Sequence, residues 1–408
     1  MIAASQPVQR RPDAKLLVVD ARGRIRHASR STFTEFLHPR DLVIANDAAT
    51  LPASLHGVHL PTASPIEVRL TGRRSLGADD VREFSAILFG PGDFHTRTED
   101  RPAPPPMAPG DRLALGPLSA VVKKLLGHPR LVSLRFDGSP NRIWAGLARH
   151  GRPIQYAHVP APLALGDVWT AIAGPPVAFE PPSAGFALGW QELTDMRAKG
   201  VSFATLTHAA GISSTGNAEL DLRLPFDEPY RIPEATAAAI RRTRADGGRI
   251  VAVGTTAVRA LEHAGRRGLI RSGEDLATQR IGPGTQLRIV DVILSGTHKP
   301  GSNHYELFRA FADDATLRQV VIELDSYGYR THEFGDSVFI ERTARAPKEG
   351  RHRPAVSRLW RGRPSPQQSL PLHEAGHAIC SIGVPGLPCT STRSTEALPR
   401  RTAPASGK

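Results

Sequence analysis

Short apolar runs bounded by turn residues recur in the N-terminal and C-terminal parts of this chain. They cover residues 15–20, 41–45, 201–206 and 250–253. A continuous apolar run of this length is typical of a strand buried on both faces, as in a parallel sheet. Helical patterns lie between the runs, at residues 32–37, 189–199 and 233–245. The alternation predicts an α/β body formed by residues 1–55 and 151–343.

The pattern changes between residues 56 and 150. Gly, Pro and Asp divide this stretch into short strand-like runs at residues 67–70, 83–89, 112–115, 119–122 and 131–136. Closely spaced short strands with turn signals are typical of a small antiparallel barrel or sandwich. We therefore predict that residues 56–150 form a small antiparallel β-barrel domain inserted into the α/β body.

The basic charge of the chain is concentrated at its C-terminal end. The formal net charge is +13, and residues 344–408 hold 11 Lys and Arg against 3 Asp and Glu. Pro, Arg, Ser and Thr dominate this segment without periodicity, so residues 344–408 are predicted to be a disordered basic tail. The body keeps a charge of only +5, which is a weak indication of an RNA partner.

Nothing in the sequence indicates a membrane protein. No apolar run approaches the length of a membrane span, and the N-terminus lacks the plan of a signal peptide. Cys380 and Cys389 both lie in the tail, so the body has no disulfide framework. We expect a cytoplasmic monomer that makes no contact with a membrane.

Residues 249–262 contain the first candidate site. The apolar run ends at Gly254, and Thr255 and Thr256 then begin a helical pattern. A strand that turns through Gly into a helix start presents backbone N–H groups and two hydroxyls at one place, which suits an anionic or polar ligand. Arg259 and Glu262 are three residues apart, so they can meet on one helix face. An ordinary capped helix explains the same pattern.

Other polar residues follow predicted strands. Asn46 and Asp47 come directly after the run at 41–45, where α/β folds bind ligands, although an Asx turn explains them equally well. His208 and His298 each lie at or just beyond a strand end. A lone histidine is more often structural than catalytic, but both positions suit a site.

Two loops and one tail segment complete the candidates. The loop at 181–185 offers Ser183 and the flexible Gly185, and the loop at 327–336 ends at Asp336. The segment from His373 to His377 matches the zinc-protease pattern of two histidines one helical turn apart with a glutamate between them. It lies in a Pro-rich tail with few residues left to build a domain, so we interpret it as a chance match and expect no metal.

The order of these segments resembles one family, the S-adenosylmethionine:tRNA ribosyltransferase-isomerases of the queuosine pathway. The matching segments are residues 15–20, 41–47 with 51–53, 181–185, 196–200 with 205–208, 253–262, 290–291 through 298–300, and 327–336. The resemblance spans roughly residues 5–342. The Gly-Thr-Thr-x-Val-Arg-x-Leu-Glu segment from Gly254 and the Asn-Asp segment are its most specific parts.

The resemblance implies an α/β body with an inserted β-barrel and a defined reaction. Members move the ribosyl part of S-adenosylmethionine onto a 7-aminomethyl-7-deazaguanine base in tRNA. They isomerise it to the epoxycyclopentane of epoxyqueuosine and release adenine and methionine. S-adenosylmethionine is thus a substrate, and the partner is a tRNA that carries the deazaguanine base.

This chemistry suggests a role for each candidate residue. An anionic or polar group of S-adenosylmethionine would be held by Thr255, Thr256 and Arg259. Ribose hydroxyls or the cationic end would be bound by Asn46, Asp47 and Asp336. The wall of the pocket would be shaped by Ser183 and Gly185. The sulfonium acidifies the adjacent C5′ hydrogen, and His208 and His298 are the candidates for acid–base work.

The chain departs from the family pattern at two candidate segments. Residues 208–214 read His-Ala-Ala-Gly-Ile-Ser-Ser where members have His-Val-Gly-Ala-Gly-Thr-Phe, and residues 296–300 read Gly-Thr-His-Lys-Pro where members have Asn-Phe-His-Leu-Pro. Two alternatives therefore stay open. One is a diverged relative that uses S-adenosylmethionine or another nucleoside with a different acceptor. The other is a non-catalytic RNA-binding protein.

Overall fold

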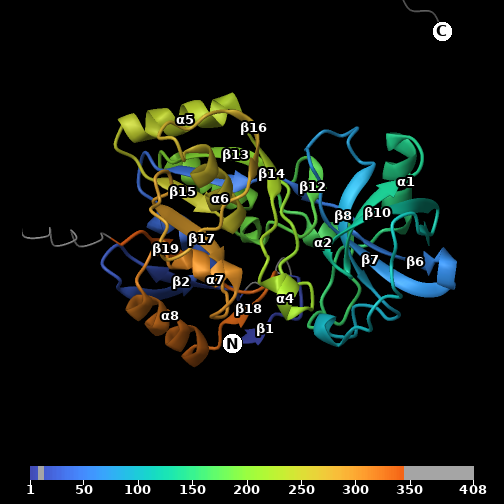
Figure 1. The fold of residues 1–408 in the computed structure, drawn as a ribbon. Coiled ribbons are helices and arrows are strands. Elements are labelled where there is room, and N and C mark those ends of the chain that lie inside the picture. Colours follow the sequence, from blue (N-terminus) through green and yellow to red (C-terminus); the bar gives the residue numbers. More distant parts are fainter. Residues whose placement is uncertain (8–12, 344–408) are drawn as a thin grey trace, which may run out of the picture. The chain divides into compact units, whose positions relative to one another are not determined.

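The computed structural model describes residues 1–7 and 13–343, which fall within one compact unit (Figure 1). The predicted disordered tail, with its two cysteines and its His373 and His377, lies outside the described residues. Within the described part, no helix has both the length and the apolar character needed to cross a membrane.

A nine-stranded sheet forms the centre of the α/β body. In spatial order its strands are β16 (Gly273–Ala277), β14 (Glu228–Ile232), β13 (Ser202–His208), β4 (Leu42–Asn46), β15 (Ile250–Val253), β17 (Val292–Gly296), β19 (Ser337–Glu341), β2 (Lys15–Val19) and β3 (Ile25–Ser29). The four strands β13, β4, β15 and β17 run parallel. Their carboxyl ends therefore lie at the same edge of the sheet.

Alternate side chains of the central strands pack on opposite faces of this sheet. On β4, Leu42 and Ile44 join one core with apolar residues of the helices α5, α6 and α8, whereas Val43 and Ala45 join a second core under α3 and the short 3₁₀ helices. All five residues of β4 are buried, as the apolar run predicts for a strand covered on both faces.

The helices and 3₁₀ helices connect the strands in chain order. They are η2 (Arg30–Phe36), η3 (Leu60–Thr62), η4 (Thr98–Asp100), α1 (Pro140–His150), α2 (Leu165–Val168), η5 (Ser183–Ala187), α3 (Trp190–Ala198), α4 (Ala218–Asp221), α5 (Glu234–Ala245), α6 (Thr255–Ala264), α7 (Asn303–Phe308) and α8 (Asp314–Ser326). The helix predicted at residues 32–37 is a 3₁₀ helix. Pro233 is the N-cap of α5, in agreement with the predicted start of that helix.

Six antiparallel strands close into the predicted barrel. They are β6 (Ser54–His59), β7 (Ser64–Gly72), β8 (Glu83–Phe89), β9 (Arg112–Leu115), β10 (Leu118–His128) and β11 (Leu131–Phe136). The fold class is therefore an α/β body with an inserted small antiparallel β-barrel. The remaining strands are short: β1 (Ile2–Ala3) pairs with β18 (Arg330–Thr331), and β5 (Ala49–Thr50) pairs with β12 (Pro176–Ala178).

Candidate functional site

Asn46 ties together three distant segments at the carboxyl edge of the sheet. Its Nδ2 donates to the carbonyl of His208 at 2.9 Å and lies 3.3 Å from the hydroxyl of Thr256. Its Oδ1 accepts from the backbone N–H of His208 at 2.9 Å and of Ala48 at 3.1 Å. The bond to Ala48 is the Asx turn, and the others join β4, β13 and the start of α6. The Asx turn that the sequence offered is therefore present, and ligand binding by Asn46 stays a prediction.

Both ring nitrogens of His208 lie close to acceptor atoms, and Nδ1 makes the hydrogen bond. Nδ1 lies 2.8 Å from the carbonyl of Thr256, which can only accept, so Nδ1 carries a hydrogen. Nε2 lies 3.0 Å from Oε2 of Glu228 on β14, and the residue is completely buried. Neither ring nitrogen faces open space. We therefore interpret His208 as a residue that positions Thr256 and Glu228.

Arg259 completes the strand-end cluster, which we define as Asn46, His208, Glu228, Thr256 and Arg259. The Arg259 guanidinium contacts the carboxylate of Glu228 and donates to three backbone carbonyls at 2.7–3.0 Å. Burial raises the pKa of Glu228, but the hydrogen bond from His208 and the charges of His208 and Arg259 lower it below its usual range. The cluster is therefore a buried ionic network.

Glu262 does not meet Arg259 as its position on the helix suggested. Its carboxylate accepts three backbone N–H groups at 2.8–2.9 Å, from residues 288–290 at the entry to β17. Arg259 reaches Glu228 instead, because the antiparallel strand β14 brings that carboxylate to α6. Arg259 and Glu262 therefore do not contact each other as expected. Arg259 contacts Glu228 instead, and Glu262 binds the backbone of residues 288–290.

Gly254 makes the turn from β15 into α6. It adopts φ of 90° and ψ of 154°, a conformation open almost only to glycine. A Cβ there would lie 3.4 Å from the Cβ of Ala184 in η5. The turn therefore places the first N–H groups of α6 and the Thr255 and Thr256 hydroxyls next to the loop that carries Ser183 and Gly185.

Substitution of Gly254 tests this geometry. Gly254→Ala should lower the free energy of unfolding by about 1–3 kcal/mol, because a side chain forces this backbone into a costly region. Gly166→Ala is the matched control, since Gly166 lies in α2 with a negative φ and open space around the added Cβ. The control should stay within about 1 kcal/mol of the wild type in urea denaturation. Equal stability of the two variants would contradict the strained turn.

Asp47 and Asp336 have well-defined partners. The Asp47 carboxylate accepts the hydroxyls of Thr205 and Thr207 at 2.8 and 2.7 Å, and the side chain is partly exposed next to the cluster. Asp336 is buried and accepts the backbone N–H groups of Lys15 and Arg330. Asp336 therefore closes the loop between β18 and β19 and lies outside the strand-end cluster.

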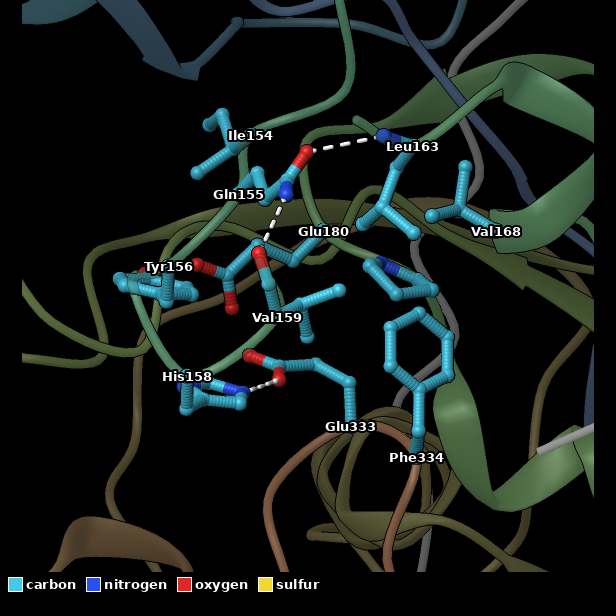
Figure 2. Close-up of a pocket in the computed structure, with 11 residues that line it drawn as sticks. Ile154, Gln155, Tyr156, His158, Val159, Leu163, Val168, Glu180, Glu333 and Phe334 are labelled. Atoms are coloured by element: carbon cyan, nitrogen blue, oxygen red, sulfur yellow. Dashed lines mark hydrogen bonds and ion pairs between the residues drawn. The ribbon is translucent and has the colours of Figure 1, made fainter. Parts of the chain in front are cut away.

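A second group of ionisable side chains lines a small cavity, here called the acidic pocket. Figure 2 shows the carboxylates of Glu180 and Glu333 in this cavity, with Tyr156 and His158 beside them. The phenol of Tyr156 donates to Glu180, and His158 Nε2 lies 3.2 Å from Oε2 of Glu333. The lining residues are Ile154, Gln155, Tyr156, His158, Val159, Leu163, Val168, Glu180, Pro181, Glu333 and Phe334.

The two carboxyl groups of the acidic pocket have pKa values shifted in opposite directions. Burial and the charge of Glu333 raise the pKa of Glu180 to about 7. Burial also acts to raise the pKa of Glu333, but the hydrogen bond from His158 and the charges of His158 and His332 lower it below its usual range. Two neighbouring carboxyl groups with separated pKa values are a typical arrangement for proton transfer.

The strand-end cluster and the acidic pocket share one connecting segment. After β13, the N–H of Gly211 donates to Glu228 at 2.6 Å, and the N–H of Ser213 donates to Glu180 at 3.1 Å. The segment in which the sequence departs from the family pattern thus holds one carboxylate of each group. The two groups therefore belong to one candidate site.

His298 lies beside this site, just beyond β17. The preceding Thr297 donates through its N–H to the carbonyl of Asp336 and through its hydroxyl to the carbonyl of Arg330, which joins it to the loop that carries Glu333. The ring of His298 is partly buried, and its centroid lies 4.6 Å from that of the His304 ring. Burial lowers the pKa of His298 well below its usual value, and the charges of His304 and His332 lower it further. His298 is therefore neutral near pH 7.

Four residues of the site were not among the sequence candidates. They are His158, Glu180, Glu228 and Glu333. Two of them had a usable signal, since Glu180 directly precedes the loop at 181–185 and Glu333 lies within the loop at 327–336. Glu228 lies on a strand that the sequence analysis did not predict, and no local pattern distinguishes His158.

Comparison with known proteins identifies the family. A family model described as queuosine biosynthesis protein matches residues 1–340. This chain belongs to the queuosine biosynthesis protein family. The expectation of membership in an enzyme family of queuosine biosynthesis is thereby confirmed.

Several members of the family are similar to this chain over almost their whole length. The S-adenosylmethionine:tRNA ribosyltransferase-isomerase of Sorangium cellulosum is 33% identical over 83% of this chain and 95% of its own length. That of Synechococcus elongatus is 30% identical over 84% and 94%. A solved S-adenosylmethionine tRNA ribosyltransferase from Thermotoga maritima is 24% identical and covers 83% of this chain and 96% of its own, with a TM-score of 0.44.

Proposed function

We propose that this protein is an S-adenosylmethionine:tRNA ribosyltransferase-isomerase. In the proposed reaction it transfers and isomerises the ribosyl part of S-adenosylmethionine onto 7-aminomethyl-7-deazaguanine in tRNA, and the products are epoxyqueuosine, adenine and methionine. Family membership and the names of the similar proteins support this assignment. We also propose that the protein acts as a cytoplasmic monomer.

One observation supports the proposal most strongly. The hydrogen bonds of Asn46 join the Asn-Asp segment, the His208 segment and the Thr255-Thr256 segment at one edge of the sheet. These are segments on which the family resemblance rests, and they are far apart in the sequence. Open α/β sheets bind ligands at the carboxyl ends of their strands, which is where these segments meet.

Several residues of this edge would bind S-adenosylmethionine. The N-terminus of α6 with Thr255 and Thr256 suits the methionine carboxylate, because helix N-terminal N–H groups and the helix dipole favour an anion. The partly exposed Asp47 would bind ribose hydroxyls or the cationic end. The loop with Ser183 and Gly185 would form the adjacent wall. Asn46 and Asp336 would shape the site through their backbone contacts.

We assign proton transfer to His298 and Glu180. A neutral His298 would accept the C5′ proton that the sulfonium acidifies, since its lowered pKa keeps a ring nitrogen free of a proton at pH 7. Glu180, with its pKa raised to about 7, would donate a proton to the departing adenine. His208 and Arg259 would act as positioning residues, because each is fully engaged with Glu228 and backbone carbonyls.

A diverged relative with a different acceptor is the second candidate. It is favoured by the segment after His208, which departs from the family pattern and donates the Ser213 N–H to Glu180. A change in this segment would shift the Ser213 N–H and with it the Glu180 carboxylate that lines the acidic pocket. A changed position of Glu180 would suit a different acceptor, while the use of S-adenosylmethionine is kept.

The deciding experiment follows both products. The full chain is incubated with S-adenosylmethionine and tRNA that carries 7-aminomethyl-7-deazaguanine, and unmodified tRNA serves as the control. Mass spectrometry of nucleosides should detect epoxyqueuosine only with the modified tRNA, together with an equal amount of adenine. Adenine without a new nucleoside would favour the second candidate. Absence of both products, with no S-adenosylmethionine binding by calorimetry, would contradict both and favour a non-catalytic RNA-binding protein.

A further inference from the structure

Two histidines and a carboxylate converge at the acidic pocket. His158 lies in the loop before α2, and His332 and Glu333 lie in the loop between β18 and β19. One ligand atom from each of the three lies within 4.8 Å of the other two. The rings of His158 and His332 have centroids 4.4 Å apart. Nothing in the proposed reaction requires three such groups together.

We propose that His158, His332 and Glu333 bind a divalent transition metal ion of the zinc class. Two histidines and one glutamate are a ligand set that zinc uses in proteins, and three protein ligands leave a coordination position open for water or a substrate atom. The ion goes beyond the proposed function, and its binding would contradict the expectation of no metal made from the sequence. The proposal concerns binding by this chain's residues and assigns no catalytic step to the ion.

The distances in the cluster fit this ion. Tetrahedral ligands at about 2.0–2.1 Å from zinc are about 3.3–3.4 Å from each other. His158 Nε2 and Glu333 Oε2 are 3.2 Å apart, so this pair already has close to the spacing of two zinc ligands. The other two separations between ligand atoms are at most 4.8 Å, so small side-chain movements would bring these atoms to the spacing of zinc ligands. Both loops therefore need little rearrangement to enclose an ion.

The pocket beside the cluster is lined by acidic groups, which suits a cation. Glu180 is 7% exposed and lines the same cavity as Glu333. The residues that line the pocket in the described part of the chain include these two carboxyl groups but no Lys or Arg.

The backbone of the loop holds His332 next to His158. His332 has φ of 70°, a left-handed conformation that few residues other than glycine adopt. The carbonyl of His332 accepts from Gly335, and Asp336 accepts from the N–H of Arg330, so the loop is closed on both sides. Because the backbone of this loop is already fixed, His332 lies next to His158 before an ion binds. Binding then needs little further ordering of the backbone.

Zinc titration of the full chain tests the proposal. Chelator-treated protein is titrated with Zn²⁺ against a chromophoric chelator, and with Co²⁺ to record the absorption of a tetrahedral site. His332→Asn keeps a residue that tolerates the left-handed backbone, and Glu333→Gln is a second, nearly isosteric variant. Each should weaken binding at least about 100-fold, since a direct ligand is lost. Circular dichroism checks that both variants are folded.

Two controls separate this site from other histidines. His95→Ala removes an exposed histidine that pairs with Asp93 and stacks on Phe94, and it should leave the affinity unchanged. A His373→Ala/His377→Ala double variant removes the zinc-protease-like pattern of the tail and should also retain the high-affinity ion. Loss of the ion only in the double variant would overturn the proposal. So would unaltered binding by His332→Asn and Glu333→Gln, or no binding by the wild type at micromolar Zn²⁺.

Discussion

Replacing Arg259 by alanine should lower the free energy of unfolding by about 3–5 kcal/mol, the usual cost of removing one partner from a buried ion pair. The guanidinium is 6% exposed and its partner Glu228 is 8% exposed, so neither charge is well solvated. The substitution leaves the Glu228 carboxylate buried with His208 and the N–H of Gly211 as its remaining partners, and neither replaces the lost guanidinium charge. It also removes the donors to three backbone carbonyls of the surrounding segments.

Urea denaturation measures this loss, and calorimetry with S-adenosylmethionine separates the two possible roles of Arg259. Arg112→Ala is the control, because Arg112 forms an ion pair with Asp137 at the surface and should change stability by less than about 1 kcal/mol. A positioning residue weakens ligand binding and stability together. Full stability with severely weakened binding would instead indicate direct contact with the ligand, and full stability with normal binding would remove Arg259 from the site.

Glu180→Gln should slow product formation by about 10²–10⁴-fold, the usual contribution of a general acid. Glutamine keeps the size of the side chain and one acceptor oxygen but carries no carboxyl proton to transfer. With a pKa of about 7, the wild-type group loses its proton as the pH rises through neutrality. The wild-type kcat/KM should therefore fall above about pH 7, and this decline should be absent in the variant.

The same pKa predicts how stability changes with pH. The pKa of Glu180 in the folded protein is about 7, above the ordinary value of 4.5, so between these values the folded state holds a proton that the unfolded state has lost. Stability relative to Glu180→Gln should then fall by roughly 3 kcal/mol as the pH rises from 4.5 to 7 and level off above it. Parallel stability curves for the two proteins would contradict the raised pKa.

Glu274→Gln is the matched control for both measurements. Glu274 is an exposed carboxylate on β16 at the edge of the sheet. Its replacement should alter neither the rate nor the pH profile. A decline above pH 7 that persists in Glu180→Gln would show that another group donates the proton.

Local sequence patterns predicted many elements with accurate bounds. The runs at 83–89, 112–115, 131–136 and 250–253 are strands with the same limits. These runs are bounded by Gly, Pro or charged residues, and their burial is visible in their own composition. By contrast, β14 reads Glu-Pro-Tyr-Arg-Ile, which has a proline and two charges, and only its pairing with β13 and β16 makes it a strand. Its Glu228 therefore escaped prediction.

The sequence by itself determined the fold class and the family, because apolar runs encode buried strands and the ordered motifs of residues 15–336 are local features. It also placed Asn46, His208 and Thr256 at strand ends, whose convergence follows from parallel pairing. Only the tertiary structure decided the partner of Arg259, the meeting of Glu180 with Glu333, and the raised pKa of Glu180. Pairing between distant side chains and their removal from water depend on packing in three dimensions, which no local pattern records.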